Sequence, residues 1–206
     1  MSSPQLAAFG IHLAEPPAPT QKLRSGVPEL DAFLSGGLPF GAVTEWGMPL
    51  GRGGRLVVAR FLRGSPTVKT PLTLWVRPNN NPLVIYPPAW RAQGVDLARV
   101  RFAHSARPVA QLKPLFMDPL FKIIVLDSPE TMAPEDVAYL ARQARANGQL
   151  IMILRNYMLS SERGNVWAKL RMNCWAEPFA AQPFRLQVIR GFSFRRLSFA
   201  LGDTPS

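Results

Sequence analysis

The residues best suited to chemistry form a glycine-rich run at positions 47–55, which reads GMPLGRGGR. An apolar segment at residues 42–46 precedes the run and predicts a strand, and residues 56–62 predict a helix after it. A glycine-rich turn between a strand and a helix presents backbone N–H groups and a helix N-terminus, and both attract phosphate. The arrangement therefore predicts a phosphate-binding loop.

This loop lacks the two side chains that a working phosphate loop uses. A lysine that reaches the β- and γ-phosphates and a Ser or Thr hydroxyl that holds magnesium normally follow its last glycine. Gly54 and Arg55 occupy those positions. Two interpretations stay open, a weak anion site strengthened by Arg52 and Arg55 or a turn that binds nothing. The residues of this vestigial loop are Met48, Pro49, Gly51, Arg52, Gly53, Gly54 and Arg55.

Carboxylates are scarce where catalysis would need them. Asp127, followed by Ser128, ends an apolar run at residues 121–126, and without the lysine and the hydroxyl we interpret it as a structural residue. Glu45 is interpreted in the same way. Three further acids lie near a predicted helix start, where carboxylates stabilise the helix dipole, and they are Glu130, Glu135 and Asp136. We therefore predict no catalytic residue and no cofactor.

The formal net charge of +11, from 24 Lys and Arg against 13 Asp and Glu, favours a polyanionic partner. DNA, RNA, an acidic protein patch and a membrane surface all qualify, and the alternative is a solvated basic face. Residues 166–174 alternate apolar and polar side chains, which predicts a half-exposed strand. We expect DNA contacts on and near its polar face, with Trp167 able to stack on a base. The candidates are Arg155, Arg163, Trp167, Lys169 and Arg171.

Apolar runs and helical patterns alternate along the chain. Further strands are predicted at residues 72–76, 100–102, 121–126 and 150–154, and further helices at residues 90–93 and 134–146. Continuous apolar runs are typical of strands covered on both faces. The last part alternates instead and predicts antiparallel strands over residues 166–174, 184–188 and 192–200. The predicted fold is α/β, a mixed, mostly parallel sheet with helices on both faces and a C-terminal antiparallel meander.

The two ends of the chain differ from the core domain predicted over residues 22–201. The prolines of residues 1–21 predict a flexible tail, and residues 202–206 predict a frayed end. The single cysteine, Cys174, suits a reducing cytoplasm, and together with His12 and His104 it is too little for a metal site. No apolar run predicts a membrane span. The tail carries a candidate partner-binding piece made of Leu6, Phe9, Ile11 and Leu13.

Several short motifs, in this order, resemble the RecA family. They match the family's entry into its ATPase core, the segment before its third strand, its Walker B strand and the strand that ends in its sensor pair, which here is Arg155-Asn156. The matching segments are residues 25–31 (SGVPELD), 36–41 (GGLPFG), 43–45 (VTE), 94–96 (GVD), 123–128 (IIVLDS) and 150–156 (LIMILRN). The resemblance covers about residues 23–201 and implies a RecA-like core.

The departures from that family point to one subgroup. Residues 77–82 contain no carboxylate where the family has its catalytic glutamate, and the second DNA-binding loop, at residues 158–165, is shortened. The family's folded N-terminal segment and large C-terminal domain have no counterpart. A degenerate RecA core of this length is similar to the ImuA family.

That resemblance implies a non-catalytic role in SOS-induced, error-prone translesion DNA synthesis. The implied partners are RecA, ImuB, a DnaE-type error-prone polymerase and, weakly, DNA. The alternatives are a SulA-type inhibitor of cell division, which is also a degenerate RecA-like protein, a stand-alone DNA-binding protein and an ATPase with an unusual loop.

Overall fold

The structure is a computed structural model that describes residues 21–63, 71–80, 85–129, 132–191 and 195–202. The strands are β1 (Lys22–Leu23), β2 (Leu38–Pro39), β3 (Ala42–Gly47), β4 (Thr73–Arg77), β5 (Val100–His104), β6 (Ile123–Asp127), β7 (Leu150–Arg155), β8 (Leu170–Ala176), β9 (Phe184–Arg190) and β10 (Arg196–Phe199). The helices are α2 (Pro28–Phe33), α3 (Gly54–Leu62), α4 (Pro87–Ala92), η1 (Leu97–Arg99), α5 (Pro108–Gln111), α6 (Lys113–Met117) and α7 (Pro134–Asn147).

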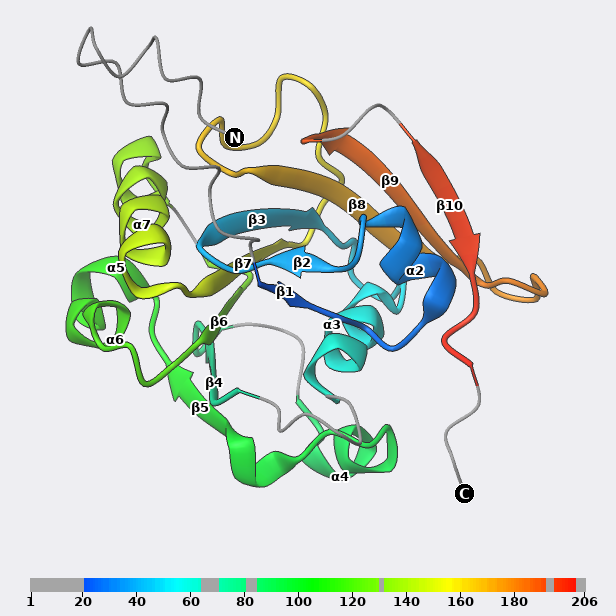
Figure 1. Cartoon of the computed structure of the whole chain (residues 1–206), viewed down its shortest axis with the longest axis horizontal. Coiled ribbons are helices and arrows are strands. Elements are labelled where there is room, and N and C mark those ends of the chain that lie inside the picture. Colours follow the sequence, from blue (N-terminus) through cyan, green and yellow to red (C-terminus); the bar gives the residue numbers. More distant parts are fainter. Residues whose placement is uncertain (1–20, 64–70, 81–84, 130–131, 192–194, 203–206) are drawn as a thin grey trace, which may run out of the picture.

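Eight of these strands form one mixed sheet in the order β10-β9-β8-β3-β7-β6-β4-β5 (Figure 1). The six strands from β8 to β5 pair in parallel, and β9 and β10 continue the sheet antiparallel. The short strands β1 and β2 form a separate antiparallel pair. The predicted α/β class, the mostly parallel mixed sheet and the antiparallel C-terminal strands are confirmed.

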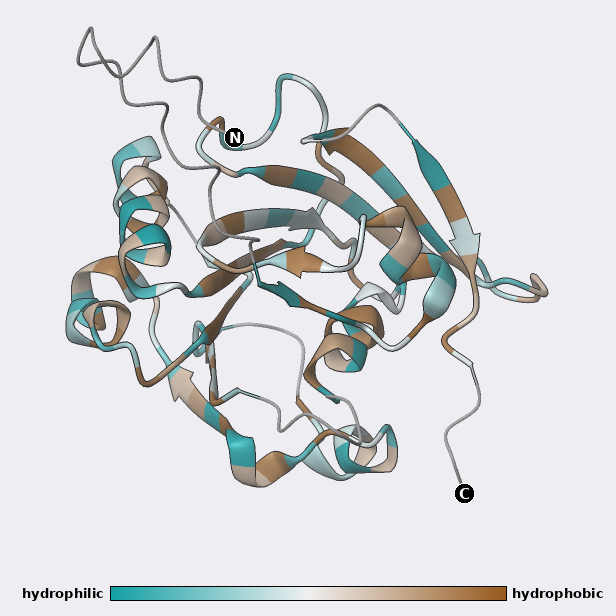
Figure 2. Cartoon of the chain, in the orientation of Figure 1, coloured by the Kyte–Doolittle hydropathy of each residue, from teal (hydrophilic) through white to brown (hydrophobic). Residues whose placement is uncertain are grey.

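Helices cover both faces of the sheet because its central strands are apolar on both sides. Along β7, Leu150, Met152 and Leu154 pack into one cluster with residues of α3, including Phe61. The residues between them, Ile151 and Ile153, pack into a second cluster with α6 and α7. The hydrophobic colour of β6 and β7 in Figure 2 follows from this burial on both faces.

The strand that joins the parallel and antiparallel parts, β8, differs from the sequence prediction in two respects. The alternating segment at 166–174 is not a half-exposed strand, because β8 begins only at Leu170 and residues 170–174 are all buried. Its polar residues Arg171 and Asn173 are 3% and 2% exposed. Val166 and Trp167 lie before the strand and are exposed. The prediction failed because alternation cannot distinguish a solvated polar side chain from a buried one that has partners.

The remaining predicted strands and helices fall within a few residues of the observed elements. The return strand β10 begins at Arg196, later than the predicted position 192, and residues 192–194 lie outside the described part. Patterns did not predict β1, β2, α2, α5 or α6, which have two to six residues each. No described helix has the length and hydropathy needed to cross a membrane. The partner-binding piece at Leu6, Phe9, Ile11 and Leu13 lies outside the described residues.

Candidate functional site

The vestigial loop connects the end of β3 to the start of α3. Gly51 and Gly53 have left-handed φ values of 71° and 65°, which glycine adopts without strain. The carbonyl of Arg52 accepts a hydrogen bond from the N–H of Ala176 (2.6 Å), so the loop is attached to the end of β8. Met48, which directly follows β3, is fully buried.

Gly54, at the lysine position of the motif, is packed directly against the backbone of β8. A Cβ at this residue would lie 2.6 Å from the carbonyl oxygen of Cys174 and 3.1 Å from Cγ of Met48. Real side chains do not come so close to a backbone oxygen, so a lysine fits here only if β8 moves away from α3. The local packing therefore selects glycine.

Arg55, at the hydroxyl position, joins the ends of three parallel strands. Its Nε lies 2.9 Å from Oδ1 of Asp127, at the end of β6. Its Nη2 donates to Oγ of Ser128 (2.8 Å) and to Oδ1 of Asn156 (2.5 Å), which follows β7. Its Nη1 donates to the carbonyl of Met48 (3.2 Å), which follows β3. The guanidinium is therefore engaged inside the molecule and is not directed toward an anion in the loop.

The Asp127 carboxylate has partners on both oxygens. Besides Arg55, Oγ of Ser128 lies 3.1 Å from Oδ1, and Oδ2 accepts a hydrogen bond from the indole N–H of Trp75 (3.3 Å) on β4. The side chains of Arg55 and Asp127 are 18% and 2% exposed, so the ion pair is largely shielded from water. This agrees with the interpretation of Asp127 as a structural residue and explains it by the arginine that faces it.

Glu45 is the centre of a second buried ionic cluster, on β3. Its Oε1 lies 2.9 Å from Nε of Arg155, and its Oε2 lies 3.8 Å from Nε of Arg171. Oε2 also accepts a hydrogen bond from the N–H of Asn165 (2.6 Å). Glu45 is 1% exposed, and the two arginine side chains are 11% and 3% exposed. A carboxylate at this depth requires such partners, because an unpaired buried charge is strongly unfavourable.

The same cluster holds the surface loop, residues 156–169, which connects β7 to β8. Arg171 donates to the carbonyls of Ser160 and Arg163, the latter at 2.7 Å. Asn173 holds Leu159 on both sides, accepting from its N–H (2.7 Å) and donating to its carbonyl (2.9 Å). The loop is thus attached to the sheet by buried polar side chains.

The five predicted DNA contacts separate into two groups. Arg155 and Arg171 point inward to Glu45, so they are not available to a phosphate backbone. Arg163, Trp167 and Lys169 lie exposed on the surface loop, with Trp167 53% exposed and the Arg163 guanidinium 3.6 Å from the ring centroid of Tyr157. Sequence reasoning missed Arg190, which is exposed and donates to the carbonyl of Val166 (2.7 Å).

The single cysteine is a core residue. Cys174 is fully buried, and this burial raises the pKa of its thiol, which disfavours the reactive thiolate. Among the described residues, no group of three or more His, Cys, Asp or Glu side chains is arranged to hold a metal ion.

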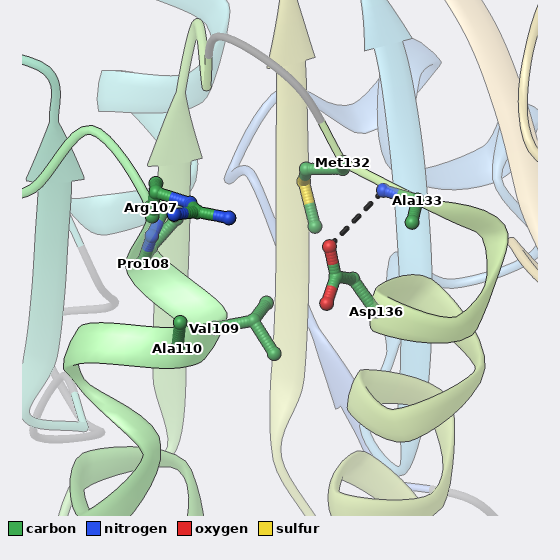
Figure 3. A pocket seen from close by; sticks show the side chains of 7 residues that line it. All are labelled: Arg107, Pro108, Val109, Ala110, Met132, Ala133 and Asp136. Atoms are coloured by element: carbon green, nitrogen blue, oxygen red, sulfur yellow. Dashed lines mark hydrogen bonds between the residues drawn. The ribbon is translucent and has the colours of Figure 1, made fainter.

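A hollow of about 460 Å³ lies between α5 and the start of α7 (Figure 3). Asp136 at its wall accepts a hydrogen bond from the N–H of Ala133 (3.0 Å), so its carboxylate serves the start of α7. Arg107, on the opposite wall, is exposed. The lining contains no residue of the vestigial loop and no predicted DNA contact; it consists of Arg107, Pro108, Val109, Ala110, Met132, Ala133 and Asp136.

Comparison with known proteins adds no identification. No model of a known protein family matches the chain, and no curated protein matches it.

We expect the Glu45→Gln variant to lose about 3–5 kcal/mol of unfolding free energy, because it leaves Arg155 and Arg171 as buried charges without a counter-ion. Urea unfolding of the variant and the parent chain measures the loss. The matched control is Glu135→Gln, at an exposed position in the first turn of α7, where the expected loss is below about 1 kcal/mol. Equal losses in the two variants would contradict the central role of Glu45.

Proposed function

We propose that this chain is a RecA-like accessory protein without ATPase activity that acts in SOS-induced, error-prone translesion DNA synthesis. It acts by binding RecA, ImuB, a DnaE-type polymerase and DNA. The observation that carries the non-catalytic part is the ion pair between Arg55 and Asp127. The partners rest on the resemblance to the ImuA family.

The ion pair supports this proposal because of the positions that it joins. In P-loop NTPases, magnesium is held between the Ser or Thr of the loop and the Walker B aspartate. Here the residues at those two positions, Arg55 and Asp127, contact each other directly at 2.8 Å. A guanidinium remains charged at any physiological pH. Magnesium would therefore have to displace a permanent cation to reach the aspartate.

The sheet supports the RecA-like assignment. The vestigial loop follows β3, an internal parallel strand, and Asp127 ends β6, which is separated from β3 by β7 alone. In open parallel sheets, ligands bind at the carboxyl ends of the strands. Three of the segments that resemble RecA motifs, namely the loop, the Asp127–Ser128 pair and Asn156, thus come together where a nucleotide would be expected.

Exposed residues of the surface loop support a weak DNA contact. Arg163 and Lys169 provide positive charge, and Trp167 offers an aromatic face on which a base can stack. Arg190 lies beside them through its bond to Val166. A basic surface with an exposed aromatic ring suits single-stranded DNA.

We expect no binding of ATP with magnesium in isothermal titration calorimetry. Gly54 supplies no charge to the phosphates, and the Arg55 guanidinium already pairs with the Asp127 carboxylate that would face magnesium. An active P-loop ATPase under the same conditions is the positive control. A dissociation constant in the micromolar range would contradict the non-catalytic assignment.

For DNA, we expect weak binding that falls steeply with salt. The double variant Arg163→Glu/Lys169→Glu removes two candidate phosphate contacts and should lower the slope of log affinity against log salt by about 1.4 for single-stranded DNA. Fluorescence anisotropy with a labelled oligonucleotide measures this slope. Reversal of Arg155 or Arg171 is not informative, because it would disrupt the Glu45 cluster.

The control for that experiment is Arg91→Glu/Arg196→Glu, which changes the net charge equally at exposed positions on α4 and β10. If both double variants weaken binding to the same extent, the surface loop is not the DNA contact.

For the partners, we expect capture of RecA and shortening of RecA filaments on single-stranded DNA. A head-to-tail contact ends a filament when the added subunit cannot offer the next docking surface. Filament length is measured by electron microscopy with the intact chain and with residues 22–206. Activity of the intact chain alone would assign the contact to residues 1–21.

Pull-down with ImuB, the polymerase and the division protein FtsZ completes that test. Capture of FtsZ without RecA or ImuB would favour the SulA-type alternative. Failure to bind RecA, ImuB and the polymerase would contradict the proposed function.

A further inference from the structure

We infer that Arg55 is a built-in cation that fixes the surface loop, residues 156–169, in one conformation without any nucleotide. This inference rests on the proposed function for what the loop contacts, namely DNA. It concerns the regulation of that contact. The juxtaposition that carries it is the contact of one guanidinium with both Asp127 and Asn156, the first residue of the loop.

Two hydrogen bonds converge on the start of the surface loop, and a third links their two donors. Asn156 Oδ1 accepts from Arg55 Nη2 (2.5 Å) and from Ser128 Oγ (2.6 Å), and Arg55 Nη2 also donates to Ser128 Oγ (2.8 Å). Ser128 has a left-handed φ of 55°, a conformation that is unfavourable for an L-residue. This cost is offset by contacts that its position permits, including its N–H bond to the carbonyl of Leu154 (2.9 Å).

The contacts continue from Asn156 into the loop. The next residue, Tyr157, lies under the guanidinium of Arg163, and Leu159 is held on both sides by Asn173. Gly47, at the end of β3, is packed against this segment, since a Cβ there would lie 2.7 Å from the carbonyl oxygen of Tyr157. Arg55 therefore fixes the first residue of the loop, and the contacts of Tyr157 and Leu159 hold the residues that follow it.

The chemistry of Arg55 explains why nucleotide is unnecessary. In nucleotide-controlled proteins, a phosphate and its metal ion order a nearby loop, and the loop is released when they leave. Here a permanent, covalently attached cation provides the ordering contacts. The loop that carries Arg163, Trp167 and Lys169 should thus be constitutively formed, and DNA contact should not respond to ATP.

Hydrogen–deuterium exchange on the full chain, read by mass spectrometry, tests this inference. The informative variant is Asn156→Ala, which removes the acceptor on the loop and leaves the Arg55–Asp127 ion pair intact. Loss of a charge-assisted hydrogen bond should speed exchange in peptides spanning residues 156–169 by about ten-fold or more. Peptides from α7 should keep their exchange rates. Ser161→Ala, an exposed change in the same loop, is the matched control and should have no effect.

A second variant, Arg55→Ala, should show the same local acceleration, and about 10 mM guanidinium ion should reverse it by occupying the vacated position. Addition of ATP and magnesium to the parent chain should leave exchange unchanged. The inference is overturned if Asn156→Ala leaves exchange in the loop unchanged, if it accelerates exchange equally in α7, or if ATP slows exchange in the parent loop.

DNA binding of the same variants separates this inference from the proposed function. Weaker binding by Asn156→Ala supports both. If the parent chain binds no DNA but its loop still loosens selectively in Asn156→Ala, the proposed DNA contact fails and the ordering role of Arg55 stands.

Discussion

The Arg55–Asp127 ion pair lies where the carboxyl ends of β3, β7 and β6 meet, and it joins residues 72 positions apart in the sequence. Parallel strands bring backbone carbonyls and strand-end side chains to one edge of a sheet, which is where α/β proteins usually bind ligands. An arginine at this edge reaches all three strand ends through its planar fork of donors, which a lysine ammonium would not match. The rest of the local structure follows from this arrangement, since Trp75, Ser128 and Asn156 each form a hydrogen bond with one of the two paired side chains.

Glu45 forms a second buried ionic cluster, on β3, with arginines of the two neighbouring strands, β7 and β8. Three arginines and two carboxylates are enclosed in these two clusters, so the surface retains most of the positive excess. Counting charges in the sequence therefore gave the correct sign for the surface but not the identity of the residues that present it. Arg155 and Arg171 are parts of the framework, and Arg163 and Lys169 are the accessible cations.

Local patterns were sufficient for the central parallel strands. The runs at β6 and β7 are apolar at every position, and such runs predict strands covered on both faces. Patterns failed where a polar residue is buried with partners distant in sequence. Glu45 and Arg155 are 110 residues apart, and no local signal connects them. The role of Arg55 was missed for the same reason, because its side-chain partners at the ends of β6 and β7 are 72 to 101 residues away. The absence of the lysine and the hydroxyl was evident from the motif itself.

The packing of Gly54 against the Cys174 carbonyl bears on how this loop could change by substitution. A working phosphate loop needs space for a lysine between α3 and β8, and here even a Cβ at Gly54 would lie 2.6 Å from the Cys174 carbonyl oxygen. A change of Gly54 to lysine would meet the backbone of β8, and a change of Arg55 to threonine would leave Asp127 without its counter-ion. Neither change is favourable alone, because each one disturbs packing or pairing that the present sheet depends on. The packing of the sheet is thus enough to keep a magnesium-nucleotide site from forming here by single substitutions.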